Sequence, residues 1–104
     1  MAPWILTLKG TLAAVFVEQG EYQKGLEWAL SVAKESEEMP SPTRDDIVGA
    51  NLATAALGYF HLGERETAMH YLQQATALAP NELAIQKAAA AIQGNKTAVE
   101  NYKT

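Results

Sequence analysis

Apolar residues recur at helical spacing in the middle of the chain. The first set advances in steps of three or four residues, so its members share one face of a helix. They are Val48, Leu52, Ala55, Tyr59 and Leu62. A second set follows Gly63, which suits the left-handed backbone that ends a helix, and stops at Pro80, which cannot continue one. Its members are Ala68, Tyr71, Leu72, Ala75, Leu78 and Ala79. The pattern predicts two antiparallel helices joined by a short turn.

The first third of the chain has a similar pattern. A helix is expected from Pro3 to a break at Gly20, followed by a second helix from about Tyr22 to Glu38. The apolar stripe of the first helix is predicted to be Ile5, Leu8, Leu12, Val15 and Phe16. The inward face of the second is predicted to be Tyr22, Leu26, Ala29, Val32 and Ala33. This segment therefore predicts another helical hairpin.

The two hairpins match each other when Gly20 is aligned with Gly63. Residues of similar kind then pair 43 positions apart along both helices. The pairs are Ala13 with Ala56, Phe16 with Tyr59, Glu21 with Glu64, Gly25 with Ala68 and Trp28 with Tyr71. The chain thus contains an internal repeat, with the extra residues of the first unit placed in the segment 35–43.

The central hairpin resembles a tetratricopeptide repeat, a helix-turn-helix unit of 34 residues. The residues that carry the resemblance are Leu52, Ala55, Ala56, Tyr59, Gly63, Ala68, Leu72, Ala75 and Pro80. The segment departs from the family at Ala55, where a large residue is usual, and at Arg65, where an aromatic residue is common. The resemblance implies an all-α fold in which antiparallel helix pairs stack into a right-handed superhelix.

One domain of about five helices is expected from this arrangement. Repeat one spans about 3–38, a loop spans 39–42 and repeat two spans 43–80. A capping helix is expected at 82–93, because repeat arrays need a terminal helix with a polar outer face. Its apolar side is predicted to be Leu83, Ala84, Ala88, Ala91 and Ile92. The tail 94–104 is interpreted either as a short sixth helix or as a frayed end.

Composition and charge exclude several classes of protein. A formal net charge of −4 and only 8 scattered Lys and Arg residues argue against nucleic acid as the partner. The chain has no Cys, which excludes disulfides and fits a reducing compartment. The apolar run 10–17 is shorter than a membrane span and lacks the flanks of a signal peptide. We therefore expect a cytoplasmic protein without direct membrane insertion.

No catalytic constellation is found in the sequence. His61 and His70 are the only histidines, and neither Cys nor clustered carboxylates join them in a pattern typical of metal ligands. No nucleophile triad order, phosphate-binding loop or zinc-helix motif occurs. We expect no enzyme activity, no cofactor and no metal.

The resemblance also implies a concave groove lined by the first helix of each pair. Carried onto this chain, the groove positions from the first helix are Thr7, Gly10, Thr11, Ala14, Val17 and Glu18. Those from the third helix are Ala50, Ala53, Thr54, Leu57, Phe60 and His61. Family members that clamp acidic chaperone tails carry Lys, Arg and Asn here, where this chain has Gly10, Ala14 and Thr54. The face is instead mildly apolar, and we expect it to receive a peptide or a partner helix.

Two function classes stay open at this point. The first is a non-catalytic protein-protein interaction module or scaffold. The second is a regulatory or self-associating domain cut from a larger enzyme or membrane-associated protein. Two repeats are fewer than a stable array generally needs, so a homodimer is one alternative, in which a second copy covers the groove. In another alternative the C-terminal tail covers it.

Overall fold

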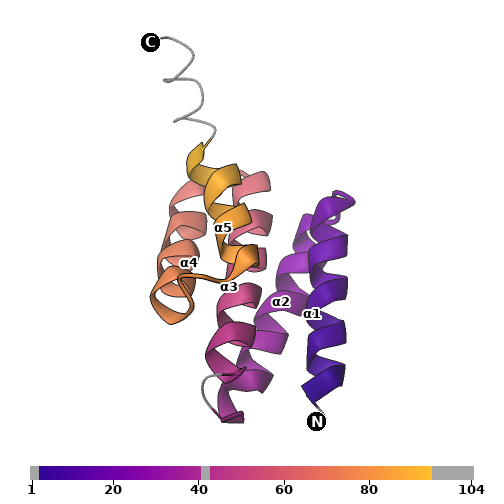
Figure 1. The fold of residues 1–104 in the computed structure, drawn as a ribbon. Coiled ribbons are helices and arrows are strands. Elements are labelled where there is room, and N and C mark those ends of the chain that lie inside the picture. The colour runs from indigo at the N-terminus through magenta and orange to yellow at the C-terminus, as the bar shows by residue number, and fades with distance from the viewer. Residues whose placement is uncertain (1–2, 41–42, 95–104) are drawn as a thin grey trace.

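The computed structural model describes residues 3–40 and 43–94, and this part of the chain is all-α, with no strand. Five α-helices pack against one another (Figure 1). They are α1 (Pro3–Glu18), α2 (Tyr22–Glu35), α3 (Thr43–His61), α4 (Arg65–Leu78) and α5 (Leu83–Ala89). A 3-10 turn, Ser36–Glu38, extends α2, and a π-helical segment, Ala90–Gly94, extends α5. The expected sixth helix or frayed end lies outside the described residues, apart from Gly94.

Two glycines end the first helix of each pair, as predicted. Gly20 and Gly63 have φ angles of 90° and 88°, a conformation that costs glycine little. In the second turn, the amide of Gly63 donates to the Phe60 carbonyl and that of Glu64 to the Tyr59 carbonyl. The first turn has the same two bonds 43 residues earlier, from Gly20 to Val17 and from Glu21 to Phe16. Both are Schellman turns, so the sequence repeat is also a repeat of backbone hydrogen bonds.

An aromatic pair ties the two helices of each hairpin together near the turn. Phe16 and Trp28 meet edge to face with ring centroids 5.3 Å apart, and Tyr59 and Tyr71 stack at the same separation. Burial, and then the neighbouring Tyr71 and Glu64, raise the pKa of Tyr59 above its ordinary value. Equivalent positions therefore form an aromatic contact in both hairpins, edge to face in the first and stacked in the second.

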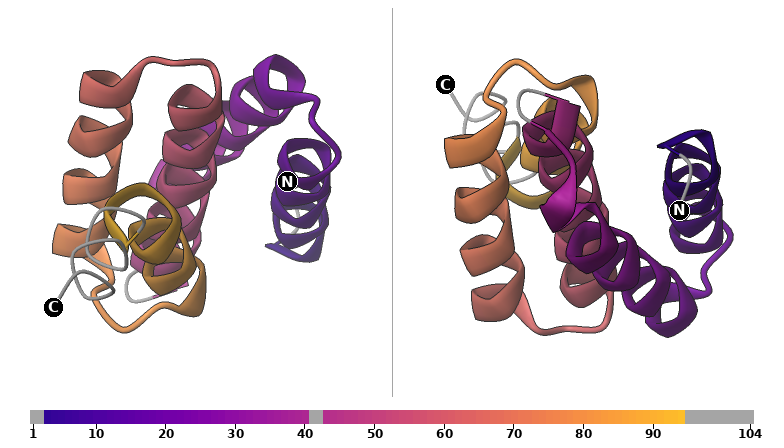
Figure 2. Two further views of the ribbon diagram at one scale, coloured as in Figure 1. Left: turned by 90° about the horizontal axis from the view of Figure 1, so that it is seen from above. Right: turned by 90° about the horizontal axis from the view of Figure 1, so that it is seen from below.

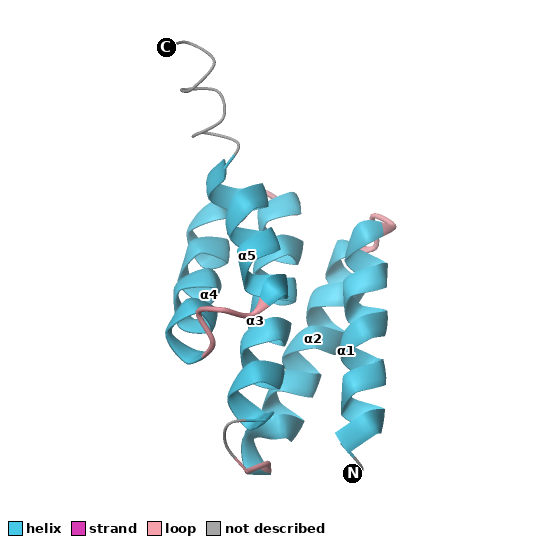
Figure 3. Cartoon of the chain, viewed as in Figure 1, coloured by secondary structure: helices cyan, strands magenta, loops and turns pink. Residues whose placement is uncertain are grey.

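Helix α3 lies at the centre of the molecule and contacts α1, α2, α4 and α5 (Figures 1 and 2). Its sequence is accordingly rich in small residues, which let neighbouring backbones approach. Most of its middle is buried, namely Gly49, Asn51, Leu52, Ala53, Thr54, Ala55, Ala56 and Gly58. Figure 3 shows that short loops connect the helices, so sequence neighbours pack as antiparallel pairs.

The predicted inward stripe of α1 was wrong in part. Leu8 and Leu12 are 52% and 37% exposed, whereas Leu6, Ala13 and Val17 are buried. The physical reason is the close approach of α2, in which Gly25 lies directly against Val17 and the Ala13 carbonyl. That contact selects the Ala13 side of α1 as the inner face.

Three leucines at helix ends are also exposed, against expectation. They are Leu62, Leu78 and Leu83. Leu62 follows the last residue of α3, Leu78 is the last residue of α4, and Leu83 begins α5, so all three lie at helix ends. Ala88 and Ile92, from the predicted apolar side of this last helix, are buried, and Ile85 is buried with them in place of Leu83.

The close contact between α1 and α2 predicts that a methyl group added at Gly25 lowers the stability of the fold. A Cβ on Gly25 would lie 2.5 Å from a Val17 methyl and 2.9 Å from the Ala13 carbonyl oxygen. We expect Gly25→Ala to lower the free energy of unfolding by about 1–3 kcal/mol, although alanine is the better helix former. Chemical denaturation followed by circular dichroism measures this change.

Ser31→Ala, at an exposed position of the same helix, is the control and should change stability by less than about 0.5 kcal/mol. A stabilising effect of Gly25→Ala would show that the two helices do not approach as closely as described.

A groove between the first, third and fifth helices

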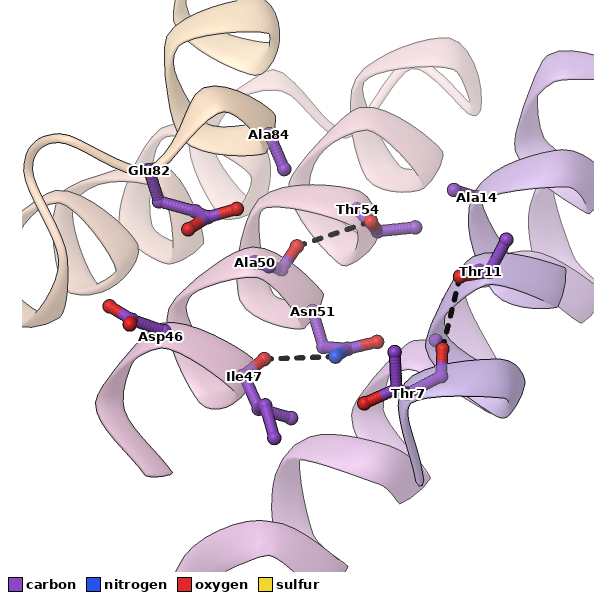
Figure 4. A pocket seen from close by; sticks show the side chains of 11 residues that line it. Thr7, Thr11, Ala14, Asp46, Ile47, Ala50, Asn51, Thr54, Glu82 and Ala84 are labelled. Atoms are coloured by element: carbon purple, nitrogen blue, oxygen red, sulfur yellow. Dashed lines mark hydrogen bonds between the residues drawn. The ribbon is translucent and has the colours of Figure 1, made fainter. Parts of the chain in front are cut away.

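Two adjoining hollows form a groove with α3 as its floor. The first hollow, with a volume of about 370 Å³, is shown in Figure 4. Its walls come from α1 on one side and from the start of α5 on the other. It is lined by Thr7, Gly10, Thr11, Ala14, Asp46, Ile47, Ala50, Asn51, Thr54, Glu82 and Ala84.

The second hollow continues the groove toward the C-terminal end of α1. It has a volume of about 290 Å³ and shares Ala14, Thr54, Glu82 and Ala84 with the first. Its additional lining residues are Val17, Glu18, Leu57, Leu83 and Lys87. The groove is therefore continuous, and the Leu57 end has both apolar and charged residues along its walls.

Most of the residues assigned to the groove from the sequence do line it. Thr7, Gly10, Thr11, Ala14, Ala50 and Thr54 lie in the first hollow, and Val17, Glu18 and Leu57 lie in the second. Ala53, Phe60 and His61 do not line either hollow. Ala53 is fully buried, Phe60 packs partly against the core and edge-on to His61, and His61 stacks on Tyr22 with ring centroids 4.7 Å apart.

The wall formed by α5 was not predicted from the sequence. Glu82, Leu83, Ala84 and Lys87 line the groove, although this helix was predicted only as a cap. A signal was present, because the segment after Pro80 follows the second hairpin at the place where another first helix would begin. The groove is lined by three successive leading helices rather than two.

Asn51 was also missed, and it is the unusual residue of the groove. Its side chain reaches from α3 toward α1 (Figure 4) and is 5% exposed. The Nδ2 atom donates a hydrogen bond to the Ile47 carbonyl at 2.9 Å, which fixes the orientation of the amide. The Oδ1 atom is buried and has no hydrogen-bond partner among the described residues. A buried acceptor without a donor is uncommon and costs stability.

Gly10 of α1 faces this amide. A Cβ at that position would lie 3.0 Å from both Nδ2 and Oδ1 of Asn51. The absence of a side chain on Gly10 therefore lets α1 lie close against the Asn51 amide.

The other polar side chains of the first hollow are mainly acceptors. The hydroxyl groups of Thr11 and Thr54 donate to the carbonyls of Thr7 and Ala50, at 3.0 and 3.2 Å, so they offer lone pairs. Asp46 and Glu82 contribute carboxylates, and neither forms an ion pair with another described residue. No Lys, Arg or His of the described chain lines this hollow.

Within residues 3–40 and 43–94, no three His, Asp or Glu residues are grouped so that they could hold a metal ion. No described helix is long and apolar enough to cross a membrane.

Comparison of the chain with family models, with curated proteins and with solved structures found no match. The resemblance to tetratricopeptide repeats therefore rests on the residues of the chain alone.

The unpartnered oxygen of Asn51 predicts that this residue costs stability in the free protein. In Asn51→Leu, a side chain of similar shape removes the buried acceptor, so we expect the free energy of unfolding to be unchanged or to rise by up to about 2 kcal/mol. Thermal and denaturant unfolding measure the difference. Thr54→Val removes a hydroxyl that already has an acceptor and should change stability by less than about 0.5 kcal/mol. A loss of more than about 1 kcal/mol in Asn51→Leu would contradict the assignment.

Proposed function

We propose that the chain is a non-catalytic protein-protein interaction module of the tetratricopeptide-repeat type, which binds a peptide or a partner helix in the groove described above. The observation that carries the proposal is the continuous groove across α1, α3 and α5. A groove built on rigid helices, with small side chains along its walls, leaves room for a ligand backbone. Ala14 and Ala84 face it from opposite walls and line both hollows.

The repeated turns and aromatic pairs support the family part of the proposal. We also propose that the two hairpins stack in a right-handed superhelix, as tetratricopeptide repeats do. The net charge of −4 supports a protein or peptide partner rather than nucleic acid. A chain without Cys suits the cytoplasm, which is the location we propose.

Filling the groove tests this function. Ala14→Gln and Ala84→Gln place long neutral side chains on the two walls without deleting core atoms. Peptides selected from a displayed random library for binding to the wild-type chain should bind the double variant at least about tenfold more weakly, because their path is obstructed. Titration calorimetry measures the affinities.

Ala77→Gln is the matched control, since Ala77 is exposed on α4, which does not line the groove. Selected peptides that bind the double variant as tightly as the wild type would overturn the groove as the binding surface.

Self-association is a second candidate, favoured by a different surface. Trp4, Leu8 and Leu12 are spaced four residues apart on α1 and are 68%, 52% and 37% exposed. An apolar stripe of this kind commonly marks a contact between proteins. Under this candidate the chain is a regulatory or self-associating part of a larger protein, and a second copy covers the stripe.

Light scattering after size-exclusion chromatography tests the second candidate. We expect the wild-type chain to run at twice the monomer mass and Leu8→Lys to run as a monomer, because a charge in an apolar contact is poorly solvated. Gln73→Lys, at an exposed position of α4, is the control and should leave the mass unchanged. A wild-type chain that is monomeric at high concentration would remove this candidate.

A further inference from the structure

The first hollow of the groove combines two features that point to one kind of ligand group. Asp46 and Glu82 bring two carboxylates without ion-pair partners among the described residues, and Asn51 brings a buried oxygen without a donor. In Figure 4 Glu82 extends over α3 from the α5 side, while Asn51 lies between α3 and α1. A ligand group that complements these acceptors must carry positive charge and N–H donors.

We propose that the groove binds a peptide that inserts a lysine or arginine side chain among Asp46, Glu82 and Asn51. This inference rests on the proposed function and names the chemistry of the partner. A guanidinium or an ammonium group provides the positive charge and the N–H donors that complement these three side chains. The long aliphatic stem of either side chain suits the passage between Thr54, Ala14 and the Gly10 backbone, all of which line the hollow.

The second hollow defines what should lie next to the basic residue. Val17, Leu57 and Leu83 are apolar residues of this hollow, and Leu83 is 60% exposed, while Glu18, Glu82 and Lys87 also line it. Apolar side chains of the same peptide would cover the three apolar residues. The occupant is therefore a basic residue with apolar neighbours, which differs from the acidic tails that carboxylate-clamping repeats bind.

Gly10 makes the site sterically selective. Because a Cβ there would lie 3.0 Å from both amide atoms of Asn51, even one methyl group would press on the side chain that the ligand must reach. Gly10→Ala thus obstructs the site while leaving every charged group in place.

A small-molecule titration tests the basic subsite without knowledge of the partner. The probes are N-acetyl-arginine amide and N-acetyl-citrulline amide, which is nearly the same shape but uncharged. In ¹H-¹⁵N correlation spectra we expect saturable shifts with the arginine probe at the Asn51 side-chain amide and at the backbone amides of Asp46 and Ala50. The citrulline probe should give much smaller shifts.

Variants then assign the effect to individual groups. Glu82→Gln and Asn51→Leu should each weaken binding of the arginine probe, and Gly10→Ala should weaken it with no change in charge. Glu66→Gln is the matched control, because Glu66 is exposed on α4 outside the groove. Equal shifts with both probes, or no shifts at the groove, would overturn the inference.

A double-mutant cycle extends the test to peptides selected for groove binding. Replacing the basic residue of a selected peptide by Gln should weaken binding to the wild type about tenfold, and should cost much less against Glu82→Gln. Selected peptides that bind the groove without Lys or Arg would overturn the inference and leave the proposed function standing. Failure of the wall-filling variants described earlier would instead overturn the function itself.

The same titration separates a peptide partner from a second copy of this chain. If a basic residue of another copy occupied the hollow, the arginine probe would bind more weakly as the protein concentration rises. That result would overturn the proposal of a separate peptide. Affinity that is independent of protein concentration supports it.

Discussion

The fold depends on how closely other helices can approach α3. A Cβ on Gly58 would lie 2.9 Å from the Leu26 side chain of α2, and one on Gly49 would lie 3.2 Å from Ala79 and Ile85. These contacts let α2, α4 and α5 pack around a single helix, while the resulting core consists largely of alanine. Such a core gains little from each side chain, so its stability must come from dense packing along the whole helix. The same constraint leaves α3 as the floor of the groove.

The departure of Ala55 from the tetratricopeptide pattern becomes understandable in this context. Ala55 is fully buried in a cluster with Ala13, Leu26 and Ala29. Since Leu26 of α2 fills the space beside α3, a large residue at position 55 would compete with it. The large side chain at this interface is therefore Leu26 of α2, and the small Ala55 lets the two hairpins pack closely.

The turns and the helix order could be predicted because each depends on local signals: Gly20, Gly63 and Pro80 act on their own backbone. Groove residues such as Ala14 and Thr54 were predicted only through the resemblance to tetratricopeptide repeats. The face of α1 could not be predicted in the same way, because residues 3–17 contain one charged side chain, Lys9, and are apolar on nearly every side. Only the contact with Gly25 decides which apolar face is buried. The wall formed by α5 depends likewise on a tertiary contact with α3.

The 43-residue repeat also explains the difference between Leu8 and Asn51, which occupy equivalent positions. In the second hairpin this position is covered by the first hairpin, and Asn51 is 5% exposed there. In the first hairpin no described residue occupies the corresponding place, so Leu8 remains exposed. An apolar residue at an open position and a polar one at a covered position reverse the pattern expected from burial alone. This reversal is understandable if each residue is matched to something outside the described chain: Leu8 to an apolar surface, and Asn51 to a hydrogen-bond donor that enters the groove.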